Sequence, residues 1–252
     1  MCWNGKASTT LSIIGFIGCS ISAYKKDSPV LWGCLAYFSL MEVLQAFTYN
    51  VINSCFDLRN QVATSLGYLH ISLQPFFINA ISMYFIPKEA QKKIATPVFM
   101  ICFICFIVMF VQAFPYHSFS LIPKAAAPMC SDRLCSVSGN WHIAWEFPIN
   151  NIFNLNAPIS LFGIPLSFGN IVWAPYIISA FLLPIAYGSW RFTLYHFLVG
   201  PVLARLTTSN INEFPAIWCL FSIGLLLIVI KTRIRNILFI KKLWWFDQKM
   251  RF

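Results

Sequence analysis

Seven apolar stretches, each close to the length of a membrane-crossing helix, constrain this chain more than any other feature. A helix needs about 20 predominantly apolar residues to cross roughly 30 Å of hydrocarbon. The stretches lie at 7–24, 29–52, 62–85, 94–114, 169–187, 190–207 and 214–230. The sequence therefore predicts an all-α fold in which residues 1–230 form a polytopic transmembrane bundle of seven helices.

Composition agrees with a protein that is solvated by lipid. Apolar residues make up 58% of the 252 residues and charged residues only 10%, whereas soluble domains use about 25% charged residues. The formal charge of +10 would suit nucleic acid in a soluble protein. Here the cations lie between apolar stretches and in the tail, so we expect the lipid bilayer and its anionic head groups as partners, and no nucleic acid.

The positions of the 18 Lys and Arg residues predict the orientation, because cations near span ends are retained on the cytoplasmic side. One side of the predicted bundle has few of them: Lys6, Arg59, Lys124, Arg133 and Arg205. The other side has the rest: Lys25, Lys26, Lys88, Lys92, Lys93, Arg191, Lys231, Arg233, Arg235, Lys241, Lys242, Lys249 and Arg251. We therefore expect the amino terminus outside and a basic cytoplasmic tail at 231–252 that contacts anionic lipids.

The first stretch also has features of a secretory signal peptide. Lys6 precedes a short apolar run that ends near the small residues Ser22 and Ala23. Cleavage would leave six spans and would place most cations outside, against the positive-inside rule. We therefore expect this helix to be retained.

The longest predicted loop, about 115–167, is rich in aromatic residues and is expected on the exterior. Its large aromatic residues include Trp141, Trp145, Phe147, Phe153 and Phe162. Aromatic side chains concentrate at membrane–water interfaces, so this loop is predicted to cap the bundle.

Four cysteines fall on the predicted exterior, where disulfides persist. These are Cys2, Cys55, Cys130 and Cys135. Four thiols allow three pairings, and free or metal-binding thiols are the alternative. The short spacing makes Cys130–Cys135 the predicted disulfide.

Polar side chains at membrane depth are the candidate functional residues, because an ionisable group inside a span costs about 2.5–3.5 kcal/mol on insertion scales. Glu42 and Gln45 share one helix face in the second stretch, as His70 and Gln74 do in the third, and His196 lies in the sixth. Counting from the outer end places Glu42 about 15 Å deep, His70 about 12 Å, and Gln74 and His196 about 18 Å. These five residues are predicted to form a substrate-binding pocket between helices two, three and six.

Three functions fit such a pocket. Buried Glu and His are common in transporters, so the leading prediction is binding or translocation of a small polar solute or ion. Glu42, His70 and His196 would also suit a divalent metal such as Zn with an open position for water, which gives a metal-dependent intramembrane hydrolase as the alternative. In the third interpretation each group only hydrogen-bonds a neighbouring helix, at about 0.6–2 kcal/mol per contact, and the protein is structural.

The predicted layout and the His in the third span, His70, resemble those of the alkaline ceramidase group of zinc-dependent intramembrane hydrolases. Members of that group pair such a His with an H-x-x-x-H motif in the last span. Here the stretch 214–230 contains no His. The resemblance therefore implies no catalytic residue in this chain.

Overall fold

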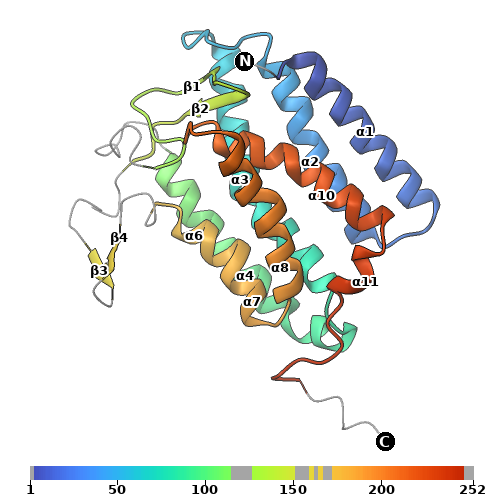
Figure 1. The fold of residues 1–252 in the computed structure, drawn as a ribbon. Coiled ribbons are helices and arrows are strands. Elements are labelled where there is room, and N and C mark those ends of the chain that lie inside the picture. The colour runs from blue at the N-terminus through green and yellow to red at the C-terminus, as the bar shows by residue number, and fades with distance from the viewer. Residues whose placement is uncertain (1–2, 115–126, 151–158, 162–163, 167–171, 247–252) are drawn as a thin grey trace, which may run out of the picture.

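The computed structural model is a helical bundle and describes residues 3–114, 127–150, 159–161, 164–166 and 172–246 (Figure 1). The first four helices are α1 (Gly5–Tyr24), α2 (Pro29–Thr48), α3 (Leu58–Tyr84) and α4 (Lys88–Ala113). Two segments with a π-helical turn inside follow: α6 (Ala174–Ile177), η1 (Ile178–Leu182) and α7 (Leu183–Ala186), then α8 (Trp190–Phe197), η2 (Leu198–Val202) and α9 (Leu203–Thr207). The last helices are α10 (Phe214–Lys231) and α11 (Ile234–Leu238). The predicted all-α class is confirmed.

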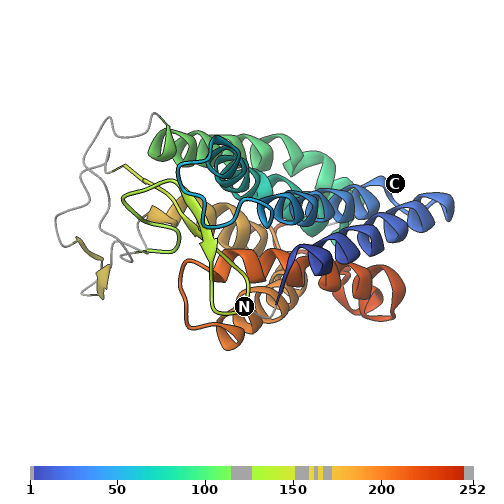
Figure 2. The same ribbon diagram turned by 90° about the horizontal axis from the view of Figure 1, so that it is seen from above.

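The centre of the bundle is held by α2 and α3. Helix α2 contacts α1, α3 and α10, while α3 contacts α2, α4 and η1. Figure 2 shows α4 on one side of these two helices and α8 with α10 on the other. A segment from late in the chain, α10, is thus a direct neighbour of α2.

Two short antiparallel hairpins belong to the segment predicted as a long loop. In the first, β1 (Cys135–Ser138) pairs with β2 (Ile143–Glu146), and in the second β3 (Ile159–Leu161) pairs with β4 (Ile164–Leu166). Of the predicted loop, residues 115–126, 151–158, 162–163 and 167 lie outside the described residues, which excludes Phe153 and Phe162 from description. The β1–β2 hairpin contacts α3 and α10 and covers one end of the bundle, here called the hairpin end (Figure 1).

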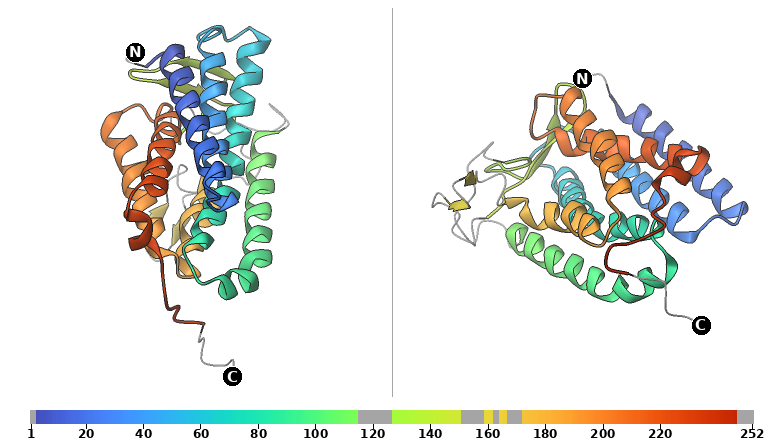
Figure 3. Two further views of the ribbon diagram at one scale, coloured as in Figure 1. Left: turned by 90° about the vertical axis from the view of Figure 1, so that its right-hand side faces the viewer. Right: turned by 60° about the horizontal axis from the view of Figure 1, so that its bottom comes forward.

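The opposite end, here called the basic end, is formed by the turns at 25–28 and 85–87 and by residues 232–246. Arg235 there donates from Nη1 to Asp27 Oδ1 (3.1 Å) and also bonds the Tyr84 hydroxyl. The Trp245 indole donates to Tyr187 O (3.0 Å). Figure 3 shows this last segment at the end of the bundle opposite the hairpin. The described part of the basic tail therefore packs on the bundle.

Helix α1 buries small and polar residues and exposes large apolar ones. The buried residues of α1 are Ser8, Ser12, Gly15, Gly18, Cys19 and Ser22, whereas Ile13 and Ile17 are each 54% exposed. In water this arrangement would be unfavourable, because large apolar side chains would be exposed to solvent. In lipid, small residues let helices approach closely and polar groups form hydrogen bonds between helices. Helices α1, α2, α4 and α10 are each long and apolar enough to cross a membrane. The fold is thus compatible with a membrane protein.

Close contact between α1 and α2 depends on glycine. A methyl group at Gly15 would lie 2.0 Å from Ser39 Oγ, and one at Gly18 would lie 3.1 Å from a Leu35 methyl. These distances are shorter than ordinary van der Waals contacts, so larger side chains would push the two helices apart. The side chain of Ser39 instead bonds its own helix, donating to Leu35 O at 2.7 Å.

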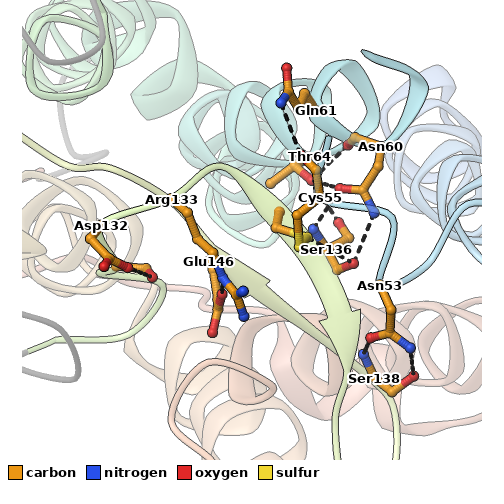
Figure 4. A network of polar contacts seen from close by, with 12 residues as sticks. Asn53, Cys55, Asn60, Gln61, Thr64, Asp132, Arg133, Ser136, Ser138 and Glu146 are labelled. Atoms are coloured by element: carbon orange, nitrogen blue, oxygen red, sulfur yellow. Dashed lines mark hydrogen bonds and ion pairs between the residues drawn. A yellow bond between two sulfur atoms is a disulfide. The ribbon is translucent and has the colours of Figure 1, made fainter. Parts of the chain in front are cut away.

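The structure corrects the predicted disulfide. Cys135 is bonded to Cys55, while Cys130 is buried and outside any disulfide. The reason is the position of β1, which lies along the start of α3. Asn60 fixes it there by accepting from Ser136 N (2.9 Å) and donating to Ser136 O (2.9 Å) (Figure 4). Cys135, the residue before Ser136, is thereby held beside Cys55.

Two more polar contacts hold the same hairpin (Figure 4). The Asn53 side chain accepts from Ser138 N (2.8 Å) and donates to Ser138 Oγ (2.9 Å). The hydroxyls of Thr64 and Ser136 are 2.8 Å apart. The hairpin is therefore fixed to the α2–α3 connection by side chains as well as by the disulfide.

Prolines account for the two π-helical turns. Pro184 is the second residue after η1, and Pro201 lies inside η2. A proline has no N–H to donate, so the regular i→i−4 pattern is interrupted and the helix widens locally. In η2 the absence of a side chain at Gly200 leaves room for Trp218, because a methyl group there would lie 2.5 Å from the indole nitrogen.

Candidate functional site

The hairpin is tied to α10 by the buried carboxylate of Glu213. Its Oε1 accepts from Trp141 N (2.5 Å) and from His142 N, and its Oε2 accepts from Thr208 Oγ1 (2.6 Å). Backbone N–H groups and a hydroxyl are good partners for a buried carboxylate. Glu213 is therefore a structural group that positions His142 over the bundle.

The imidazole of His142 is buried and neutral. Its Nδ1 accepts from Ile143 N (2.7 Å), and the Tyr49 hydroxyl lies 3.1 Å from the same nitrogen. A backbone N–H can only donate, so the ring proton is on Nε2. Burial lowers the pKa of His142 to about 3, and Nε2 has no hydrogen-bond partner. The ring thus offers an unused donor in the interior.

Glu42 and Gln45, one turn apart on α2, are the most unusual polar residues of the structure. Glu42 is 0% exposed and Gln45 is 1% exposed. Neither carboxylate oxygen of Glu42 and neither amide atom of Gln45 has a hydrogen-bond partner. An unpartnered buried polar group costs several kcal/mol in an apolar medium, so four such atoms on one turn of one helix call for a ligand.

A chain of contacts joins this pair to the hairpin. The Ser8 hydroxyl of α1 lies beside the Glu42 carboxyl and accepts from the Trp3 indole at 2.8 Å. The Trp3 ring in turn stacks on His142, with ring centroids 5.7 Å apart. Glu42, Gln45, Ser8 and His142 therefore belong to one enclosed polar region beneath the hairpin, here called the capped polar region.

Gln74 has a different environment, with its hydrogen bonds satisfied. Its Oε1 accepts from the Tyr176 hydroxyl (2.7 Å) and its Nε2 donates to Cys219 Sγ (3.1 Å). Cys219 also interacts electrostatically with Glu42. Cys219 of α10 is thus a neighbour of both Gln74 and Glu42.

A cavity of about 800 Å³ lies beside Gln74, between α3, the two π-interrupted segments and α10. Its volume is within the usual range for ligand pockets, roughly 300–1,000 Å³. Apart from Gln74, Tyr176 and Thr193 the lining is apolar and aromatic, with Phe181 and Trp218 in the wall. Its rim residues Ile177, Ile185, Leu194 and Phe197 are all more than 40% exposed on the bundle surface.

The two predicted histidines lie in separate aromatic surroundings. His70 stacks on Tyr37 of α2, with centroids 4.0 Å apart, and its backbone carbonyl accepts from the Tyr37 hydroxyl. His196 stacks between Phe181 (5.1 Å) and Phe192 (6.0 Å), behind the cavity wall. Nε2 of His70 and Nδ1 of His196 have no hydrogen-bond partner.

The structure therefore divides the five predicted residues among three places. Glu42 and Gln45 are together, Gln74 and His196 flank the cavity, and His70 faces α2. Within the described residues no group of three His, Cys, Asp or Glu side chains is placed to hold a metal ion. A Zn site at Glu42, His70 and His196 stays a prediction that their separate surroundings do not favour.

Sequence reasoning missed the contributions of α10 and of the hairpin. Helix α10 contacts both α2 and η2, so Cys219 and Trp218 occupy the position that we expected α8 to fill. His142 lies in the predicted loop, outside the apolar stretches in which polar residues were sought, and so it was not a candidate. The hairpin also approaches α3 closely at Gly67, where a methyl group would lie 3.4 Å from the Trp145 ring.

The fold and these sites define an all-helical bundle with membrane-length apolar helices and a polar interior. Residues 6–239 match the model of a family of unknown function (DUF5765), and the chain belongs to that family. The match extends from α1 through α11. Comparisons with curated proteins and with solved structures gave no match.

Proposed function

We propose that the chain is an integral membrane protein that crosses the bilayer seven times, with its first residues outside and the segment after α10 in the cytoplasm. The spans would be α1 to α4, the two π-interrupted segments and α10. The Cys55–Cys135 disulfide at the hairpin end suits an oxidising exterior. The positive-inside rule supports the same orientation, because Lys26, Lys88 and Lys241 gather at the basic end.

We also propose that the basic end contacts anionic lipid head groups. The three lysines and Arg235 line a cavity of about 900 Å³ there. Basic pockets at the cytoplasmic side of membrane helices bind acidic head groups. The sequence predicted contact with anionic lipids for the tail. Here the turns at 25–28 and 85–87 would contact lipid as well.

The function that we propose is binding of a small amphipathic molecule from the bilayer, in the cavity beside Gln74. The single observation that carries it is the cavity itself, apolar in its walls and polar at Gln74 and Tyr176. Its rim lies on a surface that would face lipid, so a ligand with a hydrocarbon body could enter sideways and place one polar group at Gln74. The flanking π-helical turns support this proposal, since such turns often mark functional sites.

This proposal changes the ligand expected from the sequence. A small polar solute or ion would leave the Trp218 and Phe181 walls without a complementary surface, whereas a hydrocarbon chain would fill them. The predicted transport is not needed for this role.

Labelling with a photoreactive long-chain alcohol tests the proposal. The purified protein in lipid nanodiscs is irradiated with the probe, and labelled peptides are identified by mass spectrometry. We expect label on the Trp218 and Phe181 peptides, competed by unlabelled alcohol. Thr193→Trp would fill the cavity and reduce the label at least fivefold, and Ile177→Trp at the rim provides a second, less disruptive block.

The control is Leu40→Trp, a substitution at a 53% exposed position of α2 that does not line the cavity. It should leave the labelling unchanged. Equal labelling of all helices, or undiminished labelling in both cavity variants, would refute binding in the cavity.

A further inference from the structure

The capped polar region contains a carboxyl group with no counter-charge. Within the described residues, the ion pairs involve Asp27, Asp57, Glu89 and Glu146, and none reaches Glu42. Buried polar groups without a partner are few in native proteins and are commonly explained by a bound water or ion. The environment of Glu42 therefore has to supply a positive charge or a proton.

The neighbours that the structure gives Glu42 on α1, α2 and α10 are neutral. They are Ser8 on α1, Gln45 and Tyr49 on α2 and Cys219 on α10, and His142 of the hairpin lies beside Tyr49. None of these is a cation at neutral pH, and the carboxylate of Glu213, which also lies near Tyr49, is engaged by Trp141, His142 and Thr208. The surroundings thus provide oxygen ligands but no charge to balance a carboxylate.

We infer that Glu42 and Gln45 bind one monovalent alkali cation, Na⁺ or K⁺, beneath the hairpin. A single carboxylate balances a single positive charge, and hard cations prefer oxygen ligands. The carboxylate of Glu42, Oε1 of Gln45 and the hydroxyl of Ser8 supply such oxygens without any thiolate or imidazole.

A cation would engage the Gln45 amide together with the Glu42 carboxylate. Protonation would neutralise Glu42 and let it donate to one neighbouring oxygen, whereas a cation can bind the carboxylate and the Gln45 amide oxygen at once, and both amide atoms of Gln45 lack partners. A cation binds the amide oxygen, and a water in its shell accepts from the amide nitrogen. The capped polar region is separate from the cavity beside Gln74, so either proposal can fail without the other.

Thermal unfolding in different salts tests the inference. The purified full chain in detergent is unfolded in choline chloride, NaCl and KCl at constant ionic strength and pH 7.5. We expect Na⁺ or K⁺ to raise the Tm saturably, by about 3 °C at a tenfold excess over Kd. Glu42→Gln keeps the shape of the side chain and should abolish this rise.

Two further variants keep the test decisive. Glu89→Gln removes an exposed carboxylate on α4 and should leave the rise intact, while Gln45→Met should weaken the apparent Kd at least threefold. If Glu42→Gln does not fold, the Gln45→Met result decides alone. A Tm that is equal in all three salts, with a pH dependence that is reduced in Glu42→Gln, would show a proton on Glu42 instead and overturn the inference.

Discussion

The two sides of this bundle differ in how tightly they pack and in whether their buried polar groups have hydrogen-bond partners. On one side α1, α2 and α10 are regular helices that pack through small residues such as Gly15, and the hairpin closes their end. On the other side α6 to α9 are interrupted by π-helical turns and leave a cavity of about 800 Å³. The closed side holds the four unpartnered atoms of Glu42 and Gln45, whereas on the open side both polar atoms of Gln74 have partners.

This difference between the two sides indicates which of them needs a bound ligand for stability. A closed, tightly packed region keeps unpartnered groups at a cost that a bound ligand would compensate, because lipid offers no hydrogen bonds there. An open cavity can instead satisfy its few polar groups internally and present apolar walls to an exchanging ligand. The following experiments separate the two sides, beginning with the largest expected effect.

Removal of the disulfide should affect the closed side most. The Cys55–Cys135 bond closes a loop of 80 residues, so its loss in the Cys55→Ser, Cys135→Ser double variant should lower the free energy of unfolding by about 2–5 kcal/mol. Thermal unfolding followed by tryptophan fluorescence measures this. Cys130→Ala, at a buried cysteine outside any disulfide, is the control, and a comparable loss there would argue against a special role for the bond.

Acid should weaken the same hairpin through His142. Its pKa is about 3 in the folded state against 6.5 in the unfolded chain, so between these values the unfolded chain binds more protons. The contribution is complete above pH 6.5, and lowering the pH from 7 to 5 should reduce the free energy of unfolding by about 2 kcal/mol. Chemical unfolding at both pH values should show a smaller change in His142→Gln. An equal change in the variant would show that other groups carry the pH dependence.

Gly15→Ala tests how tightly the closed side is packed. The new methyl group would meet Ser39 Oγ at 2.0 Å, and such overpacking costs about 1–3 kcal/mol. Gly33→Ala on α2 is the matched control, since a methyl group there meets nothing within 4 Å, and its stability should be unchanged or higher. Equal stability of the two variants would mean that α1 and α2 adjust freely.

The smallest expected effect compares one glutamine from each side. Gln74→Met removes the bonds to Tyr176 and Cys219 and should cost about 0.6–1.7 kcal/mol, the range for hydrogen bonds between membrane helices. Gln45→Met removes an amide without partners and should cost nothing in choline chloride. Unfolding titrations of the two variants in that salt give the difference. A larger loss for Gln45→Met would contradict the contrast drawn between the two sides.

Some of the site could be read from the sequence because helical spacing is a local property. Residues three apart lie on one helix face, so Glu42 and Gln45 were expected together, and they are together. The pocket between helices two, three and six was not formed as expected, because α10 with Cys219 lies beside α2. The predicted Cys130–Cys135 pair was wrong because spacing along the chain does not report where β1 lies.

What the sequence determined by itself is the helical class and the apolar stretches, because the length and hydropathy of a segment act within that segment. The tertiary structure decided which helices are neighbours, which cysteine faces Cys55 and which polar groups lack a partner. Hydropathy cannot specify these contacts, because lipid tails are as apolar as apolar side chains and give no hydrophobic preference for one helix neighbour over another. Close packing at glycines such as Gly15 and hydrogen bonds such as that of Tyr176 to Gln74 select one arrangement.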